Sequence, residues 1–120
     1  MLHPRALLLA TAAGTALQLA MVLAGHANPT VKGAFAVGGM LFSLLTGGAY
    51  VALARGTPGA SPVLGALAAG ALCALAGIGV SYALGDVPAR LLLLGTASSA
   101  VTGALGGWIA QRLVAPRVVP

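Results

Sequence analysis

Few side chains in this chain of 120 residues could act as an acid, a nucleophile or a metal ligand. The candidates are one acidic residue, Asp86, one cysteine, Cys73, and two histidines, His3 and His26. A metal site needs several good ligands at one place, and a long apolar run separates His3 from His26. Cys73 stands in the middle of another apolar run, where burial makes a thiol inert. We therefore expect no catalytic residues, no metal, no cofactor and no enzymatic activity.

Polar residues gather around the ends of the apolar runs. Those expected together at one end of the molecule are His26, Tyr82, Asp86 and Arg90, with Asn28 and Lys32 nearby. Asparagine and aspartate are good N-caps, so we interpret this cluster as loop solvation and helix capping. A binding site is the alternative, in which only His26 and Asp86 are good metal ligands. A cofactor-binding subunit of an electron-transfer complex would rest on His26 alone.

The elements that position these residues are apolar runs long enough to cross a membrane. All charged residues lie outside four apolar runs, at residues 6–31, 33–54, 56–85 and 91–111. Asp86 and Arg90 lie between the last two runs. Each run holds the roughly 20 residues that a transmembrane helix needs. Only 6% of the residues are charged and the mean hydropathy is +1.03, whereas a soluble domain carries about 25% charged residues. The composition therefore predicts an all-α integral membrane protein, a four-helix bundle of transmembrane helices.

Prolines and capping residues mark where the helices begin. The expected helices begin at His3-Pro4, Asn28-Pro29, Ser61-Pro62 and Asp86-Val87-Pro88. Proline is tolerated in a first helical turn, where its missing N–H has no partner in the helix. We expect helices at about residues 4–26, 29–54, 62–85 and 88–114 in a single domain, 1–120. A cleaved signal peptide is the alternative for the first run, whose apolar stretch exceeds the about 7–15 residues of such a segment.

The basic residues indicate how the chain is threaded through the membrane. One side would hold Arg5, Arg55, Arg112 and Arg117, and the other would hold Lys32 and Arg90. Because cytoplasmic loops carry an excess of lysine and arginine, we expect both termini in the cytoplasm, at a bacterial-type inner (plasma) membrane. The net charge of +5 is spread singly along the chain, which excludes a patch for nucleic acid. Tyr50 and Trp108 are expected as anchors at the membrane surface.

The two halves of the chain resemble each other. A shift by 56 positions, the separation of residues 39 and 95, aligns Gly39, Ser43, Thr46 and Gly47 with Gly95, Ser99, Thr102 and Gly103. This match indicates a duplicated two-helix unit, with repeats at about 4–56 and 60–114. A unit of two helices returns to its starting side, so we expect two parallel-repeat hairpins related by a two-fold axis along the membrane normal.

Each of these two stripes of small residues lies on one face of its helix. Small residues allow helix backbones to approach closely in lipid, and their hydroxyl groups can bond to a carbonyl of their own helix. We interpret the stripes as helix-packing faces, within the chain or between copies of it. A hydroxyl-lined path or a small-ligand site is the alternative. Gln18, the most polar side chain inside the first run, should face the bundle interior and bond to another helix.

No charged residue lies inside the four runs, which disfavours the coupling of transport to protons or cations. The chain is similar to the small multidrug exporters and the small fluoride channels in length and helix number only. It lacks the first-helix carboxylate of the former, and the embedded asparagine and the Thr-Thr-Phe-Ser stretch of the latter.

We expect a non-enzymatic transport or channel-type component without an embedded ion-coupling residue. Its path would be lined by Gln18, Ser43, Thr46, Ser99 and Thr102. The alternative is an accessory or scaffolding subunit of a larger membrane complex, which would pack through the glycine, serine and threonine faces. In both cases the partners are the lipid bilayer and either further copies of this chain, as a homo-oligomer, or another membrane protein.

Overall fold

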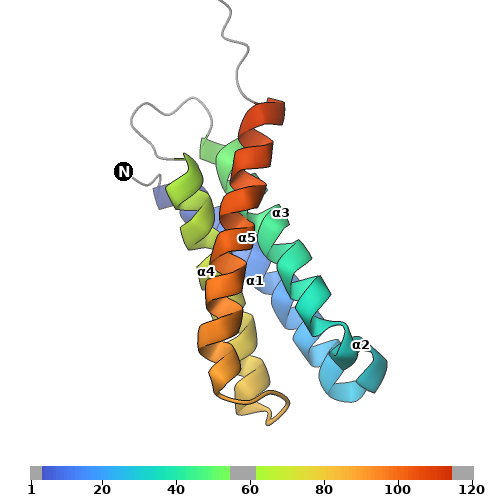
Figure 1. The fold of residues 1–120 in the computed structure, drawn as a ribbon. Coiled ribbons are helices and arrows are strands. Elements are labelled where there is room, and N and C mark those ends of the chain that lie inside the picture. The colour runs from blue at the N-terminus through green and yellow to red at the C-terminus, as the bar shows by residue number, and fades with distance from the viewer. Residues whose placement is uncertain (1–3, 55–61, 115–120) are drawn as a thin grey trace, which may run out of the picture.

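The computed structural model describes residues 4–54 and 62–114 as an all-helical bundle (Figure 1). The helices are α1 (Pro4–Ala27), α2 (Pro29–Gly33), α3 (Phe35–Ala54), α4 (Pro62–Ala83) and α5 (Arg90–Val114). Within this part of the chain, α1, α3, α4 and α5 are long and apolar enough to cross a membrane. The prediction of an all-helical chain with four candidate membrane helices is thereby confirmed. His3, Arg55 and Arg117 lie outside the described residues.

The second predicted helix is divided into α2 and α3 at Ala34. Asn28 precedes α2 in an extended conformation, and its side-chain oxygen accepts a hydrogen bond of 2.9 Å from the N–H of Thr30, as an N-cap does. Ala34 leaves the helical conformation, with φ −97° and ψ 6°, and its N–H donates to the carbonyl oxygen of Val31. Gly33, a residue type of low helix propensity, stands at this break.

Helix α4 ends at Ala83 in a Schellman motif, two residues before the predicted end at residue 85. Gly85 has a φ of +79°, a left-handed conformation that glycine adopts without strain. Its N–H donates to the carbonyl oxygen of Tyr82 at 2.9 Å, and the N–H of Asp86 donates to that of Ser81 at 3.0 Å. These are the two hydrogen bonds of the motif. The cap satisfies carbonyl groups at the end of α4 and places Asp86 directly after it.

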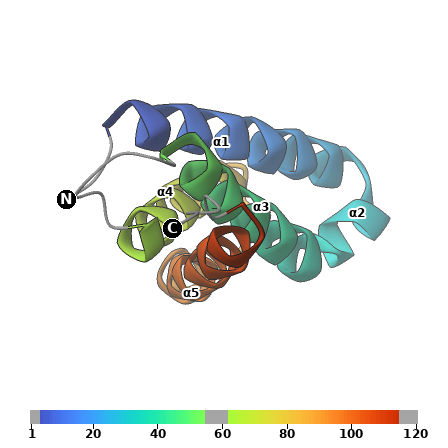
Figure 2. The same cartoon turned by 90° about the horizontal axis from the view of Figure 1, so that it is seen from above.

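The helices are arranged with α3 and α4 in the middle, α1 on one side and α5 on the other (Figure 2). Both α1 and α5 contact α3 and α4, whereas no contact joins α1 to α5 among the described residues. A two-fold axis that exchanged the two hairpins would make the α1–α5 and α3–α4 pairs equivalent. The packing of the described helices therefore lacks the two-fold axis expected from the repeat, and the duplication itself stays a prediction.

A specific pair of residues accounts for this difference between the halves. The ring of Tyr50 on α3 lies against Gly65 of α4 and is fully buried, with 0% exposure. A shift by the repeat places Gly106 and Leu9 at the equivalent positions. Gly106 lies instead against the backbone of Leu44 on α3. The prediction of Tyr50 as an anchor at the membrane surface was wrong, because Gly65 leaves room for its ring inside the bundle.

The tightest packing lies in the half of the bundle that holds the starts of α1 and α4 and the ends of α3 and α5, which we call the terminal half. Its apolar core consists of Ala6, Ala10, Tyr50, Val51, Ala54, Ala66 and Ala69. Gly47 contacts the carbonyl of Gly103 without a side chain between them, and Gly103 approaches the backbone of Ala66 and Gly70 on α4. Backbone contact of this kind gives dispersion energy in lipid, where helices have no hydrophobic drive to associate.

We predict opposite effects for two alanine substitutions of helical glycines. A Cβ atom at Gly103 would lie 2.7 Å from the carbonyl oxygen of Ala66 and 2.9 Å from Cα of Gly70, whereas nothing lies within 4 Å of one at Gly79. Both changes gain helix propensity, up to about 1 kcal/mol, but overpacking costs about 1–3 kcal/mol. Gly103→Ala should therefore lower the thermal unfolding temperature in detergent, followed by circular dichroism, and Gly79→Ala should not. Equal increases in both variants would contradict the close approach of α4 and α5.

Candidate functional site

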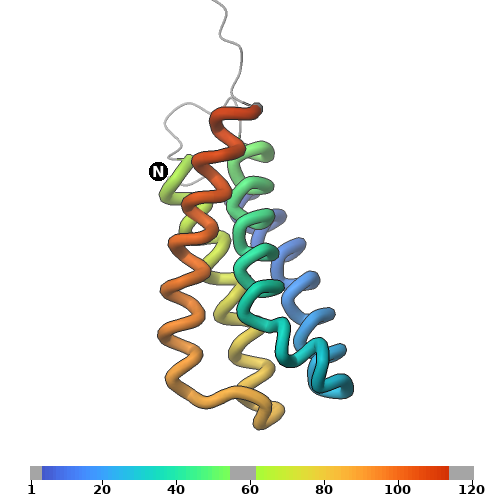
Figure 3. Tube along the Cα trace, turned by 45° about the vertical axis from the view of Figure 1, so that its right-hand side comes forward, coloured from blue at the N-terminus to red at the C-terminus, as the bar shows by residue number. Residues whose placement is uncertain are grey.

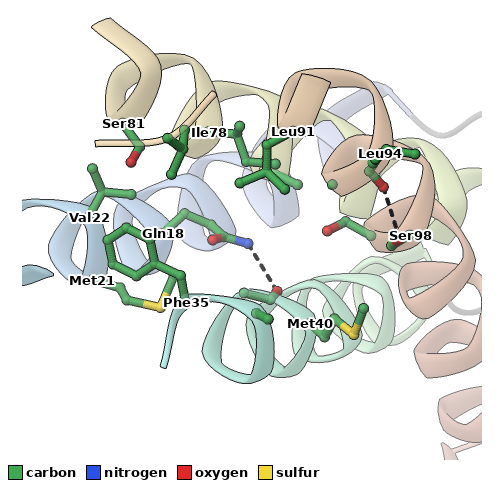
Figure 4. Close-up of a pocket in the computed structure, with 17 residues that line it drawn as sticks. Gln18, Met21, Val22, Phe35, Met40, Ile78, Ser81, Leu91, Leu94 and Ser98 are labelled. Carbon is green, nitrogen blue, oxygen red and sulfur yellow. Dashed lines mark hydrogen bonds between the residues drawn. The ribbon is translucent and has the colours of Figure 1, made fainter. Parts of the chain in front are cut away.

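A cavity of about 200 Å³ lies in the other half of the bundle, which carries α2 and the connection between α4 and α5 and which we call the hairpin half. All four long helices contribute to its lining. The apolar wall includes Met21, Val22, Phe35, Ile78, Leu91 and Leu94 (Figure 4). Polar atoms come from Gln18, Ser81, Ser98 and Ser99. An apolar cavity with a few polar groups is the usual form of a small-molecule site, and we call it the Gln18 pocket.

The pocket exists because, in the hairpin half, the small-residue stripes of α3 and α5 do not contact the backbone of a neighbouring helix. Toward α2, α3 and α5 diverge (Figures 1 and 3). A Cβ atom at Gly39 would have only the ends of Gln18 and Met21 near it, at 3.7 and 3.8 Å. Gly95 faces the side chain of Ile78 and not another backbone. On these stripes, Gly47 and Gly103 contact the backbone of a neighbouring helix, whereas the atoms nearest to Gly39 and Gly95 belong to side chains.

Gln18 is the polar centre of the pocket and is only 3% exposed. Its Nε2 donates to the carbonyl oxygen of Gly39 at 3.2 Å and to Oγ of Ser43 at 3.4 Å, with a weaker contact to Sγ of Cys73 at 3.8 Å. Gly77 of α4 lies against its Cβ. One side chain thus joins α1, α3 and α4, as the sequence predicted for a buried glutamine.

The other end of the same amide has no partner. A carbonyl oxygen only accepts hydrogen bonds, so the bond to Gly39 identifies the donating atom as Nε2 and leaves Oε1 as the remaining acceptor of the amide. Oε1 accepts no hydrogen bond from the described residues. Gln18 lines the pocket, so its free acceptor is available to a donor that occupies the cavity.

Ser81 adds a second unpaired polar group to the pocket. The residue is 2% exposed, and its Oγ has no hydrogen-bond partner among the described residues. Thr11 and Thr96 also have buried hydroxyls without partners, but neither lines the pocket. Ser98, by contrast, donates to the carbonyl oxygen of Leu94 at 2.8 Å (Figure 4). Buried polar groups are nearly always hydrogen-bonded, so an unpaired hydroxyl in a cavity needs an explanation.

The structure divides the predicted stripe residues between the two halves. Those that line the pocket are Gln18, Gly39, Gly95 and Ser99. Ser43 lies outside the lining and accepts a hydrogen bond from Gln18. Those outside it are Thr46, Gly47, Thr102 and Gly103. Thr46 and Thr102 donate to carbonyl oxygens of their own helices, at 2.7 and 2.8 Å. Sequence reasoning missed the pocket role of Ser81; the signal that could have found it is its place four residues after Gly77, which puts both small residues on one face of α4.

The predicted cluster at the hairpin end is only partly assembled. Nδ1 of His26 lies 2.8 Å from Oδ2 of Asp86, and Nζ of Lys32 lies 3.4 Å from Oδ1. Tyr82 and Arg90 are exposed, and neither has an ion pair with Asp86. We call His26, Lys32 and Asp86 the Asp86 cluster; it joins the α1–α2 region to the connection after α4. The described residues contain no group of three metal ligands.

The Asp86 cluster stabilises the ionised carboxylate. The hydrogen bond from His26 lowers the pKa of Asp86 below its ordinary value, against a smaller opposing effect of burial, and the charges of His26 and Lys32 add to the lowering. An ionised carboxylate only accepts hydrogen bonds, so Nδ1 of His26 is the donor. Val87, the next residue, lines the pocket, so the cluster lies directly beside one wall of the cavity.

Comparison of the chain with protein-family models, with curated proteins and with solved structures found no match. The function is therefore inferred from the site itself. The features that carry it are a cavity, its apolar wall, two unpaired polar groups and the absence of charged side chains among the described residues that line it.

We predict that the stability of the protein falls at acid pH through Asp86. A carboxyl whose pKa is lower in the folded than in the unfolded state stabilises the fold above its unfolded pKa, about 3.9, and loses this effect as pH falls through the folded pKa. Asp86 is the only aspartate or glutamate in the chain. The unfolding temperature in detergent should therefore drop between about pH 5 and pH 3.

Asp86→Asn should be less stable than the wild type at pH 5 and should lose most of this acid dependence. Arg90→Gln, a change at an exposed residue of the same connection without an ion pair to Asp86, should retain it. An Asp86→Asn variant with the full wild-type drop would show that another group is responsible.

Proposed function

We propose that this protein is a multi-pass membrane protein that binds a small neutral molecule in the Gln18 pocket, as a non-enzymatic transport component. The proposal rests on one observation: a glutamine amide, 3% exposed between four membrane helices, presents an unpaired acceptor at a cavity of about 200 Å³. The proposed location is a bacterial-type inner membrane with both termini in the cytoplasm, which the distribution of arginine supports.

The composition of the pocket favours an uncharged ligand. An ion that leaves water for an apolar cavity loses its hydration, and only a paired opposite charge compensates for this cost. No charged side chain belongs to the described lining. The cavity exceeds the roughly 150 Å³ in which a dry engineered cavity binds benzene, so a molecule with an aromatic ring or a short chain and one polar group fits.

The closed terminal half favours a transporter-like binding site over an open channel. The pocket is confined to the hairpin half, and beyond it the backbones of α3 and α5 meet at Gly47 and Gly103. The same contacts bear on the alternative of a scaffolding subunit. That function would use the glycine faces to hold a partner, yet Gly47, Gly103 and Gly106 are already occupied by helices of this chain.

We predict that para-fluorobenzyl alcohol binds the Gln18 pocket and that the hydroxyl group provides part of the affinity. Binding would be measured by fluorine NMR with the protein in lipid nanodiscs. Gln18→Leu should weaken binding roughly five- to tenfold, the effect of one lost hydrogen bond. The same substitution should not weaken binding of para-fluorotoluene, which has no hydroxyl group.

Thr102→Val is the matched control, because Thr102 lies outside the pocket and bonds to its own helix. It should leave the affinity for both probes unchanged. The absence of a saturable signal in the wild type would refute the proposed function. Equal losses in Gln18→Leu and Thr102→Val would show that the probe does not bind at Gln18.

A further inference from the structure

The Gln18 pocket is closed along three of the four lines where its helices meet. Between α1 and α4, a Cβ atom at Gly77 would lie 2.8 Å from Cβ of Gln18. Between α1 and α3, one at Gly38 would lie 2.6 Å from Sδ of Met21. Between α4 and α5, one at Gly95 would lie 2.5 Å from Cδ1 of Ile78. Each of these lines is filled by a side chain packed on a glycine.

The hairpin end of the pocket is also covered. Phe35, which lines the pocket, packs its ring against Gly25 of α1. The Asp86 cluster joins α1 and α2 to the connection that carries Val87. The ring of Phe35 and the Asp86 cluster therefore lie between water and the cavity at this end.

The fourth line, between α3 and α5, differs from the others. These helices meet in the terminal half and diverge toward α2 (Figure 3). At the level of the pocket, Met40 of α3 and Leu94 of α5 both line the cavity, yet they are 43% and 58% exposed. Both helices are candidate membrane spans, so an opening between them faces the hydrocarbon of the bilayer and not water.

Two polar groups of the pocket are incompletely bonded. Oγ of Ser81, on a residue only 2% exposed, has no partner among the described residues, and Figure 4 shows its side chain beside the cavity. Oε1 of Gln18 lacks a donor as well. A hydroxyl group carries both the donor that Oε1 lacks and an acceptor for the Ser81 hydroxyl.

We propose that the ligand of the Gln18 pocket is a membrane-resident neutral amphiphile, a long-chain alcohol, that enters from the bilayer between α3 and α5. Its hydroxyl group bonds to Gln18 and Ser81, and its apolar tail passes between Met40 and Leu94 into the lipid. This inference rests on the proposed function, since it identifies the ligand class and the route to the same pocket. No covalent bond is made or broken, and the ligand remains uncharged throughout.

The ligand class is tested by displacement of para-fluorobenzyl alcohol from the protein in nanodiscs. Lauryl alcohol should displace the probe. Dodecane, which lacks the hydroxyl group, and laurate, kept ionised at alkaline pH, should require about tenfold higher mole fractions in the bilayer. Equal displacement by all three compounds would overturn the assignment to a neutral alcohol. A wild-type protein that binds no probe at all would instead refute the proposed function.

The route is tested by the exchange rate of the bound probe. Leu94→Trp narrows the gap, whereas Leu93→Trp adds the same bulk at a residue that is 76% exposed and does not line the pocket. Exchange, measured by fluorine saturation transfer, should slow about tenfold in Leu94→Trp and remain at the wild-type rate in Leu93→Trp. Met40→Trp and its neighbour Leu41→Trp, which lies outside the lining, repeat the comparison on α3. Wild-type exchange in folded, probe-binding Leu94→Trp and Met40→Trp proteins would overturn the route from the bilayer.

Discussion

The architecture depends on the contact of bare backbones where Gly47, Gly70 and Gly103 bring α3, α4 and α5 together. In lipid, apolar side chains gain little by leaving one apolar surface for another, so close approach and dispersion hold helices together. Straight helices that touch at one level and cross at an angle must separate at another. The glycine contact in the terminal half therefore sets the separation of α3 and α5 in the hairpin half, where the Gln18 pocket lies.

Polar groups control how far that separation extends. Gln18 bonds across to Gly39 and Ser43 at the start of the divergence, and interhelical hydrogen bonds within a membrane contribute roughly 0.6–2 kcal/mol each. At the far end the Asp86 cluster joins the α1–α2 region to the connection after α4. The helices next to the pocket are thus tied at two levels, while the line between α3 and α5 has no equivalent tie among the described residues at the level of Met40 and Leu94.

The sequence predicts the helices better than it predicts their neighbours. Charges lie between the apolar runs and prolines lie near the ends of the runs or outside them, because each is costly inside a membrane helix, and these markers locate the four candidate spans. Neighbours depend on which side chains fit together. Tyr50 looked like an anchor at the membrane surface because nothing in the sequence connects it to Gly65, fifteen positions away on another helix. The break between α2 and α3 at Ala34 was not predicted either, whereas Lys32 and Asp86, which were expected near each other at one end of the molecule, do form an ion pair.

The stripe of small residues illustrates the same limit at the candidate site. Gly95, Ser99 and Gly103 lie on one face of α5, and periodicity alone treats them as equivalent. In the structure Gly103 touches backbone, while Gly95 and Ser99 line a cavity, since the partner helix is near one end of the stripe and far from the other. Hydroxyl groups differ in the same way. Thr46, Ser98 and Thr102 bond back to their own helices, whereas Ser81 on α4 lacks such a bond and lines the pocket. An unpaired hydroxyl in lipid costs free energy. Thr11 and Thr96 carry the same cost outside the pocket, so Ser81 points to a ligand, more than the glycines around it do, because its unpaired hydroxyl belongs to a residue that lines a cavity.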